Sequence, residues 1–388
     1  MQKRFFWTQT ILLILSALFL PTAALSDDPF SIKLKTGDLV YSPIDNKIYA
    51  SVPNDSAVNP NTLTPIDPAT GELGTPIPIG FNPGQLTISD DGTMIHVVFG
   101  GEFGVQSFDV VNQTLGYSFF IAGGPEVKEM LSIPGRPTAV LVSTHMPGFS
   151  PPATGTAVWE DGIKLPNQVG TGLGVGGPDR IAVDLADGSL AYGYQTTVTS
   201  FTNWNMVINE NGVENCGCGT LQGILTGSST KIARHAGRVF RAEGEVYNII
   251  PAFQTGLFES GDNFVLDPGT NRFYTMKPDG PVQRIYIYNL TTLQLLTDIT
   301  VSGFENSLGG DIRFGNNGFA FRNSEQVVIV PDDVVVGDLN LDGIVDLLDV
   351  QPFVDLIESG GYQLEGDINY DGSVNLLEVQ LFVDLLLN

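Results

Sequence analysis

The residues best suited to chemistry in this sequence lie near its C-terminus, in two segments of similar sequence. Residues 337–357 and 366–386 align without a gap, and 14 of 21 positions are identical. Each segment places carboxylate or amide side chains at loop positions 1, 3, 5, 9 and 12, and a backbone carbonyl at position 7. Calcium takes about six to eight oxygen ligands in this pattern. The first set is Asp338, Asn340, Asp342, Ile344, Asp346 and Asp349, and the second is Asp367, Asn369, Asp371, Ser373, Asn375 and Glu378.

The repeated pattern predicts one calcium ion in each loop, two in all. Gly343 and Gly372 occupy position 6, where the loop must turn sharply. Without a cation, the carboxylates of each loop would repel one another. The alternative is a pair of acidic, solvated loops that bind nothing. The in-register repetition of the full ligand set argues against that alternative.

An apolar segment follows each loop and must position it. We expect helices to begin near Leu347 and Leu376, with Pro352 tolerated in the first turn of its helix. The residues expected to pack one repeat on the other are Leu348, Phe353 and Leu356, with their counterparts Leu377, Phe382 and Leu385. About sixty residues bury little apolar surface, so we expect the metal to contribute to folding.

The duplicated Gly-Asp-x-Asn-x-Asp-Gly motif resembles a type I dockerin over residues 337–388. The sequence of this segment is also similar to terminal modules of secreted planctomycete proteins. The resemblance implies a protein partner of the cohesin kind. It places partner contacts at loop positions 10, 11, 17 and 18, which are polar or basic in cellulosome dockerins. Here these positions are Leu347, Leu348, Val354, Asp355, Leu376, Leu377, Val383 and Asp384. The apolar members could form a hydrophobic docking face, although we expect the leucines to belong to the core.

The N-terminal segment has the features of an export signal. Residues 1–26 combine Lys3 and Arg4 with an apolar stretch and small residues before Asp27, which predicts a signal peptide and a secreted or cell-surface protein. No later segment is apolar enough for a membrane span after cleavage.

The net charge is −25, and residues 332–388 hold 13 acidic residues without any Lys or Arg. This balance argues against nucleic acid and favours divalent cations or basic partners.

Residues 39–330 repeat a hairpin pattern, an apolar strand, a polar turn and a second strand. Seven copies recur about every 45 residues, a spacing typical of four-stranded propeller blades. They lie at 39–51, 86–98, 131–135, 181–188, 232–237, 264–269 and 312–318. A second turn follows in most units, at 66–71, 108–109, 159–162, 209–212 and 288–292. The seventh unit lacks one strand, which residues 30–35 could supply.

This pattern predicts a mainly β protein, a seven-bladed β-propeller over residues 27–330, joined by a linker, residues 331–336, to a small α-helical calcium module at 337–388. The Asp-Pro-Ala-Thr-Gly turn at 67–71 resembles those of YVTN-type propellers of secreted bacterial proteins. A β-sandwich or another repeat number is the alternative. The fifth unit is the least regular.

Other candidate chemistry is sparse. Cys216 and Cys218 are the only cysteines, and we expect a disulfide that braces its loop. No nucleophile elbow, His-Glu-x-x-His motif or phosphate loop occurs, so no catalytic residue is assigned. Acidic residues such as Asp91 and Asp187 could pair as glycosidase carboxylates, but turn formation explains them more simply.

Three functions remain open from the sequence. The leading one is a secreted, non-catalytic binding or structural protein whose propeller holds a glycan or protein ligand. The second is a component of extracellular polysaccharide degradation, a glycoside hydrolase or an accessory subunit, because dockerins often tether such enzymes. The third is a propeller lactonase or lyase. Carboxylates, His or Asn converging at the propeller centre would favour an enzyme.

Overall fold

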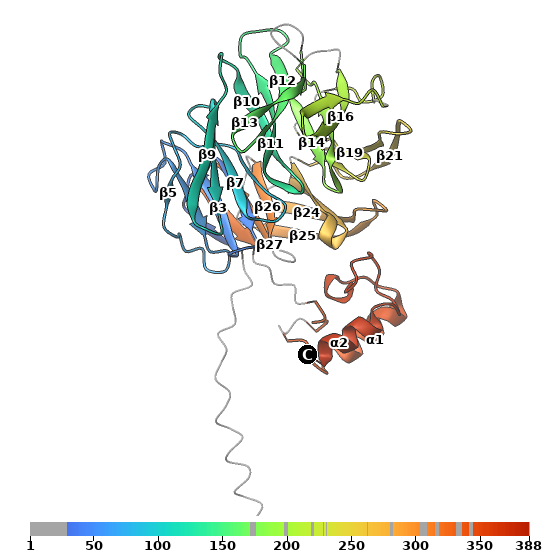
Figure 1. Ribbon diagram of the computed structural model, residues 1–388. Coiled ribbons are helices and arrows are strands. Elements are labelled where there is room, and N and C mark those ends of the chain that lie inside the picture. Colours follow the sequence, from blue (N-terminus) through green and yellow to red (C-terminus); the bar gives the residue numbers. More distant parts are fainter. Residues whose placement is uncertain are drawn as a thin grey trace, which may run out of the picture.

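The computed structural model describes residues 29–170, 176–197, 201–218, 221–227, 229, 231–261, 263–279, 282–302, 309–314, 318–330, 336–340 and 344–387. The predicted signal peptide at 1–26, residues 331–335 of the predicted linker, and the loop residues Asp342 and Gly343 lie outside this part of the chain. The described chain is mainly β, and two helices follow the strands near its C-terminus (Figure 1).

Four sheets of the described chain have four antiparallel strands each. The first holds β2 (Asp38–Ser42), β3 (Lys47–Val52), β4 (Thr62–Ile66) and β5 (Ile77–Pro78). The second holds β6 (Leu86–Ile88), β7 (Met94–Phe99), β8 (Gly104–Asp109) and β9 (Thr114–Phe120). Another holds β22 (Asn263–Asp267), β23 (Arg272–Asp279), β24 (Val282–Asn289) and β25 (Leu295–Ser302), with the 3-10 turn η1 (Pro268–Thr270). The last holds β26 (Gly309–Phe314), β27 (Gly318–Arg322), β28 (Val327–Val330) and β1 (Phe30–Ile32).

A fifth sheet has twelve strands and divides into three antiparallel groups of four. Single parallel residue pairs, Asn167 with Gly212 and Asp184 with Arg234, join these groups. The groups are β10 (Glu126–Ile133), β11 (Arg136–His145), β12 (Ala153–Glu160) and β13 (Ile163–Val169); β14 (Arg180–Asp184), β15 (Asp187–Tyr194), β16 (Asn203–Asn209) and β17 (Gly212–Asn215); and β18 (Ile232–His235), β19 (Arg238–Arg241), β20 (Glu245–Asn248) and β21 (Phe253–Leu257).

The predicted hairpins correspond to the first two strands of each group. Their turns use residues that tolerate a positive φ, such as Asn46 at 53° and Gly92 at 73°. The N-terminal strand β1 pairs with β28, with Phe30 opposite Ile329, so residues 30–32 of the predicted segment 30–35 supply the missing strand. The fifth group is complete but has short strands, and its second hairpin, β20 with β21, was not predicted.

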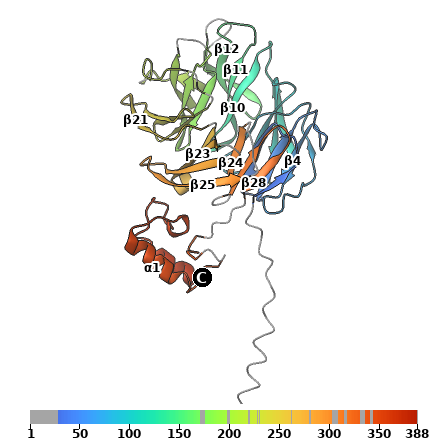
Figure 2. The same ribbon diagram turned by 180° about the vertical axis from the view of Figure 1, so that it is seen from behind.

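Apolar clusters lie between the groups rather than within them. In the described chain, one such cluster joins each group to the next, for example Leu63 with Phe108 between the first two. Another joins Ile48 of β3 to Val327 of β28, so the first and last groups also share a core. Figures 1 and 2 show the groups side by side in chain order. Burial on both faces of each group explains the dense β-branched and aromatic content of its strands.

Polar side chains of the first strands also connect neighbouring groups. Asp38 in β2 accepts a hydrogen bond from the backbone nitrogen of Leu86 at 2.9 Å. Glu129 in β10 likewise accepts from the nitrogen of Ile181 at 2.6 Å. Desolvation raises the pKa of both carboxyls, that of Glu129 to about 7. These acids therefore support the packing of one group on the next.

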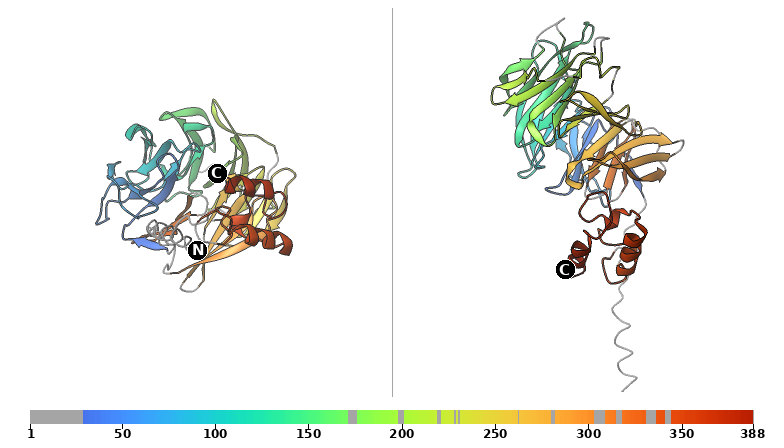
Figure 3. Two further views of the ribbon diagram at one scale, coloured as in Figure 1. Left: turned by 90° about the horizontal axis from the view of Figure 1, so that it is seen from below. Right: turned by 90° about the vertical axis from the view of Figure 1, so that its right-hand side faces the viewer.

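The helices α1 (Val350–Ser359) and α2 (Val379–Leu386), with the 3-10 turn η2 (Leu364–Gly366), pack through Phe353 and Phe382. Each phenylalanine is 3% exposed, and the ring centroids lie 4.2 Å apart. Figure 3 shows this small module below the last strands of the β region. No helix in the described residues combines the length and apolar character needed to cross a membrane.

Both helices begin three residues later than the sequence predicts. Before α1, the Asp346 side chain accepts a hydrogen bond from the nitrogen of Leu348 at 2.7 Å, and Asn375 does the same for Leu377 at 3.0 Å. These turns compete with helical hydrogen bonding and hold the leucines outside the helix. Leu348 and Leu377 are 66% and 68% exposed, so their predicted packing role is wrong. Leu385, at 36% exposed, is also not a core residue.

Candidate calcium loops and neighbouring sites

The second loop is organised around a buried carboxylate. Asp367 is fully buried, and its Oδ2 accepts hydrogen bonds from the Tyr362 hydroxyl at 3.0 Å and the Gly372 nitrogen at 3.2 Å. Gly372 has a φ of +86°, which a side chain would strain. Asp371 is exposed and accepts from the Ser373 nitrogen at 2.9 Å. Side chains at positions 1 and 5 thus shape the loop backbone.

Glu378, at position 12, has an oxygen that lacks a partner. Its Oε2 accepts from the Asn375 nitrogen at 2.7 Å, whereas Oε1 is buried without a hydrogen bond. Desolvation raises the pKa of this carboxyl, and the charges of Asp371 and Asp367 raise it further. Burying an unsatisfied carboxylate oxygen is costly, and a hard cation would satisfy it. The second loop therefore fits a calcium ion.

The first loop differs from the second at position 12, where Asp349 replaces glutamate. Asp349 is fully buried and joins the two ends of the loop. Its oxygens accept from the nitrogens of Asn340 at 3.0 Å and Asp346 at 2.8 Å. Asp338 at position 1 is 3% exposed. The described ligands again offer carboxylate oxygens to a hard cation, but the shorter Asp349 is already engaged by backbone amides.

The second loop contacts the β region through an arginine that sequence reasoning did not select. Arg272, in β23, is 1% exposed, and its Nη2 donates to Asp367 Oδ2 at 3.2 Å and to the Tyr362 hydroxyl at 3.1 Å. Its guanidinium also lies 5.3 Å from the centre of the Tyr370 ring. Burial alone would lower the pKa of Arg272, but Tyr362, Tyr274 and Asp367 outweigh it and raise the pKa. Arginine is protonated throughout the physiological pH range, so Arg272 is a cation.

The positions that the dockerin resemblance marks as partner contacts form an exposed surface. Leu347 is 80% exposed and Leu376 is 77% exposed, so the expectation that these leucines belong to the core is wrong. Val354 and Val383 are 40% and 39% exposed. The exposed Asp355 and Asp384 accept hydrogen bonds from glutamines one turn earlier in their own helices.

A groove of about 320 Å³ lies between the two helices, within this surface. Its walls are almost entirely apolar, and they include Val350, Val354, Leu376, Val379 and Val383. Large apolar surfaces of this kind usually mark interaction sites. We call the exposed leucines and valines at these positions, together with Val350 and Val379 of the groove, the apolar face: Leu347, Leu348, Val350, Val354, Leu376, Leu377, Val379 and Val383.

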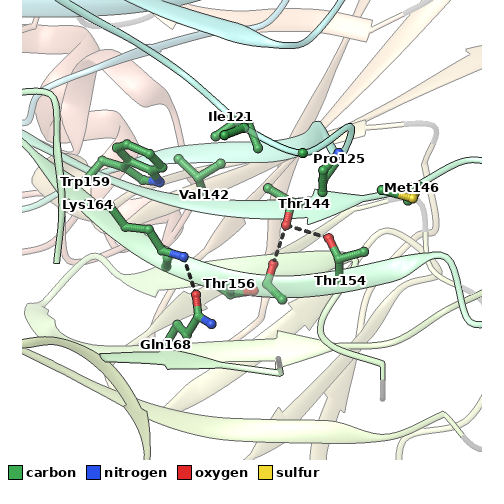
Figure 4. Close-up of a pocket in the computed structure, with 14 residues that line it drawn as sticks. Ile121, Pro125, Val142, Thr144, Met146, Thr154, Thr156, Trp159, Lys164 and Gln168 are labelled. Atoms are coloured by element: carbon green, nitrogen blue, oxygen red, sulfur yellow. Dashed lines mark hydrogen bonds between the residues drawn. The ribbon is translucent and has the colours of Figure 1, made fainter. Parts of the chain in front are cut away.

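The β region has a pocket of about 280 Å³ between the β9–β10 connection and strands β11–β13. Figure 4 shows Trp159, Thr144 and Met146 along it, and the Lys164 ammonium bonded to Gln168. The Trp159 ring stacks on Phe119, with centroids 4.1 Å apart. The described residues that line the pocket are mainly apolar or hydroxyl-bearing, and Lys164 is the one charged group among them.

One group of potential metal ligands in the described β region was not predicted. Glu102, Glu126 and His145 have ligand atoms within 4.8 Å of one another, and His145 Nε2 lies 3.5 Å from Glu126 Oε2. Glu126 and His145 face each other because of the register of β10 and β11. Nothing in the local sequence marks the three as neighbours.

The remaining candidates have structural roles. Asp91 accepts from the Thr93 nitrogen at 3.0 Å, and Asp187 accepts from the Ser189 nitrogen at 3.0 Å, which confirms their roles in turns. His96 is fully buried in β7, and desolvation lowers its pKa to about 4. Cys216 and Cys218 form a disulfide across Gly217.

Comparison with known proteins bears on the fold. No family model and no curated protein matches the chain. The β-propeller domain of Cps50 (Swd1) from Myceliophteria thermophila superposes with a TM-score of 0.51 at 9% identity, over 78% of this chain and 98% of that one. AztD from Citrobacter koseri gives a TM-score of 0.48 at 13% identity, over 74% and 80%. At such identities the likeness concerns the fold alone. The β region is similar to known β-propellers.

Proposed function

We propose that this protein is a secreted, non-catalytic binding or structural protein with two functional parts. Residues 27–330 form a seven-bladed propeller platform for a glycan or protein ligand. Residues 337–388 form a dockerin-like module that binds two calcium ions and attaches the protein to a protein partner. The observation that carries the proposal is the unpartnered, buried Glu378 Oε1, in a duplicated loop next to an exposed apolar face.

The propeller proposal rests on the regular packing of the groups. In the described chain, each four-stranded group shares an apolar cluster with the next, and the first shares one with the last through Ile48 and Val327. Strand β1 completes the last group from the N-terminal side. This pairing covers an edge of β28 that would otherwise be exposed. The pocket beside Trp159 and Lys164 supports a ligand-binding role, since it combines aromatic and polar walls.

The attachment proposal rests on the apolar face. Its leucines occur as matched pairs, Leu347 with Leu348 and Leu376 with Leu377, one pair after each loop. Because both pairs are exposed, they contribute little to the core of the module. The module carries no Lys or Arg, so a partner with an apolar patch and a basic rim would complement it.

Isothermal titration of the full chain with calcium tests this function. Two ions should bind per chain, and magnesium should bind poorly because it demands a tighter octahedron. The double variant Asp338→Ala with Asp342→Ala should lose one site, and Asp367→Ala with Asp371→Ala should lose the other. Absence of calcium uptake at millimolar ion would refute the calcium part.

The attachment and platform parts need a second experiment. Immobilised protein should capture a partner from the secreted fraction in calcium, and release it with chelator. A variant with serine at Leu347 and Leu376 should retain calcium uptake but lose capture. A glycan array with the same protein would identify a carbohydrate ligand of the platform.

A further inference from the structure

The second loop packs directly against the β region. The Asn289 amide, at the end of β24, donates to the backbone oxygen of Asp371 at 3.0 Å. A Cβ on Gly372 would lie only 2.4 Å from the Asn289 Nδ2, so the contact requires glycine at that position. Leu364 of η2 packs against the apolar cluster that contains Met276 and Ile285. Shape and hydrogen bonding therefore both fix this contact.

The charges across this contact are complementary. Residues 332–388 contain no Lys or Arg, so the module cannot neutralise its own carboxylates. Arg272, which belongs to β23, supplies a buried cation directly to Asp367. Removing either partner would leave the other buried without a counter-charge. The β region thus provides the second loop with a cation of its own.

Asp367 occupies the first ligand position of the second loop, so the Arg272 guanidinium and a calcium ion would both interact with this one carboxylate. We propose that Arg272 is a resident counter-ion that docks the module onto β23 and β24 and competes with calcium at the second loop. This inference rests on the calcium binding proposed above. Calcium in the second loop then weakens the docking, and docking lowers the calcium affinity of that loop.

The direction of the coupling follows from the relative size of two effects. Arg272 orders Asp367 through one hydrogen bond, which would favour calcium slightly by holding the ligand in place. It also puts a positive charge next to the site, in a buried environment where like charges repel strongly. Repulsion outweighs the single hydrogen bond. By linkage, the same factor applies to calcium affinity and to docking.

The test uses the full chain with the first loop silenced by Asp338→Ala and Asp342→Ala, so that titration with calcium alone reports the second loop. In this background, Arg272→Gln should tighten calcium binding by on the order of tenfold. Arg284→Gln is the matched control. It removes the same charge from the neighbouring strand β24, where Arg284 pairs with Asp279 and Asp298. Its calcium affinity should equal that of the background.

Small-angle X-ray scattering reports the docking. Calcium should increase the maximum dimension of the chain with Arg272 present, whereas Arg272→Gln should be extended with or without calcium. Asn289→Ala, which leaves Arg272 in place, should loosen the docking and tighten calcium binding. If Arg272→Gln does not fold, the calcium affinity of Asn289→Ala tests the coupling instead.

Three results would overturn the inference. The first is an unchanged or weaker calcium affinity in Arg272→Gln. The second applies if Arg272→Gln does not fold, and is an unchanged or weaker calcium affinity in Asn289→Ala. The third is scattering of the parent chain that does not change when calcium is added. Calcium uptake without any effect of these variants would refute the coupling but leave the proposed function intact. Lack of calcium uptake by the unmodified chain would refute both.

Discussion

At the scale of residues, the side chains at position 12 of the two loops differ in length by one methylene group. Glu378 reaches far enough to accept from the Asn375 nitrogen with one oxygen and leave the other unpartnered. Asp349 is shorter, and both of its oxygens accept backbone hydrogen bonds. A bidentate ligand at position 12 is the usual arrangement in calcium loops of this type. The second loop is therefore the better prepared of the two at this position.

Glu378→Gln should weaken calcium binding at the second loop by roughly tenfold or more, the scale found even for outer-shell changes at metal sites. The amide keeps an acceptor for the Asn375 nitrogen but loses the charge that attracts calcium. Calorimetric titration of the full chain measures the change. Asp349→Asn is the matched control and should have a smaller effect on the first site. Equal effects at both sites would contradict this account of position 12.

At the scale of elements, the strand β1 and the paired leucines show how short segments act beyond their own neighbourhood. Strand β1 has three residues, yet it completes the sheet that contains β28. Phe30 and Ile32 also pack against the cluster that holds Leu39 and Val327. The leucine pairs, by contrast, lie in turns before their helices and contribute surface rather than core.

Deletion of residues 27–36 should lower the thermal midpoint by about 5 °C or more, because it exposes β28 and removes three apolar side chains, Phe30, Ile32 and Leu34, from a core cluster. Differential scanning calorimetry measures it. Replacing Phe30 and Ile32 by serine tests the side chains while keeping the backbone pairing, and should give a smaller decrease. A midpoint unaffected by the deletion would show that β1 contributes nothing to stability.

Replacing Leu347 and Leu376 by serine should change the stability of the module by no more than about 0.5 kcal/mol, because both side chains are exposed. Phe353→Ala is the matched comparison. It removes a ring that stacks on Phe382 in the only core of the described module, and should cost about 3–5 kcal/mol. Helical circular dichroism during denaturation measures both. A large loss from the leucine variant would mean that the apolar face is structural.

At the scale of the whole molecule, acidic side chains connect one group of strands to the next. Glu129 reaches from β10 to the backbone of β14, and Asp38 from β2 to that of β6. Desolvation raises the pKa of both carboxyls because these acids are enclosed between groups. The stability of the β region should therefore depend on pH through its inter-group contacts.

The Glu129 carboxyl has a folded pKa of about 7 against an ordinary value near 4.5. Between these values the folded state binds more protons than the unfolded state, so stability falls as pH rises from about 4.5 to about 7 and is level above that. Glu129→Gln should remove this dependence, and should be more stable than the parent at pH 8 by on the order of 2 kcal/mol. Thermal midpoints at pH 5 and pH 8 measure it. The exposed-site variant Glu210→Gln should behave as the parent, and identical pH profiles for all three would disprove this role of Glu129.

The hairpins and the loop motif could be predicted from the sequence because both depend on local chemistry. Turn residues such as Asn46 and Gly92 adopt a positive φ wherever they occur in the chain, and alternating apolar residues mark strands. The proposed calcium ligands are likewise spaced within twelve residues of chain. The missing strand of the last group was also identifiable, since residues 30–35 alternate and the last repeat was one strand short.

Only the tertiary structure decided which distant residues meet. Arg272 reaches Asp367 across 95 positions, and His145 meets Glu102 through the packing of two groups, so no local spacing could reveal either contact. The helices begin later than the sequence predicts because Asp346 and Asn375 accept hydrogen bonds from the nitrogens of Leu348 and Leu377, which also leaves the leucines at the surface. Local chemistry determines the elements and the spacing of the proposed ligands, whereas burial, register and the pairing of charges depend on how those elements pack.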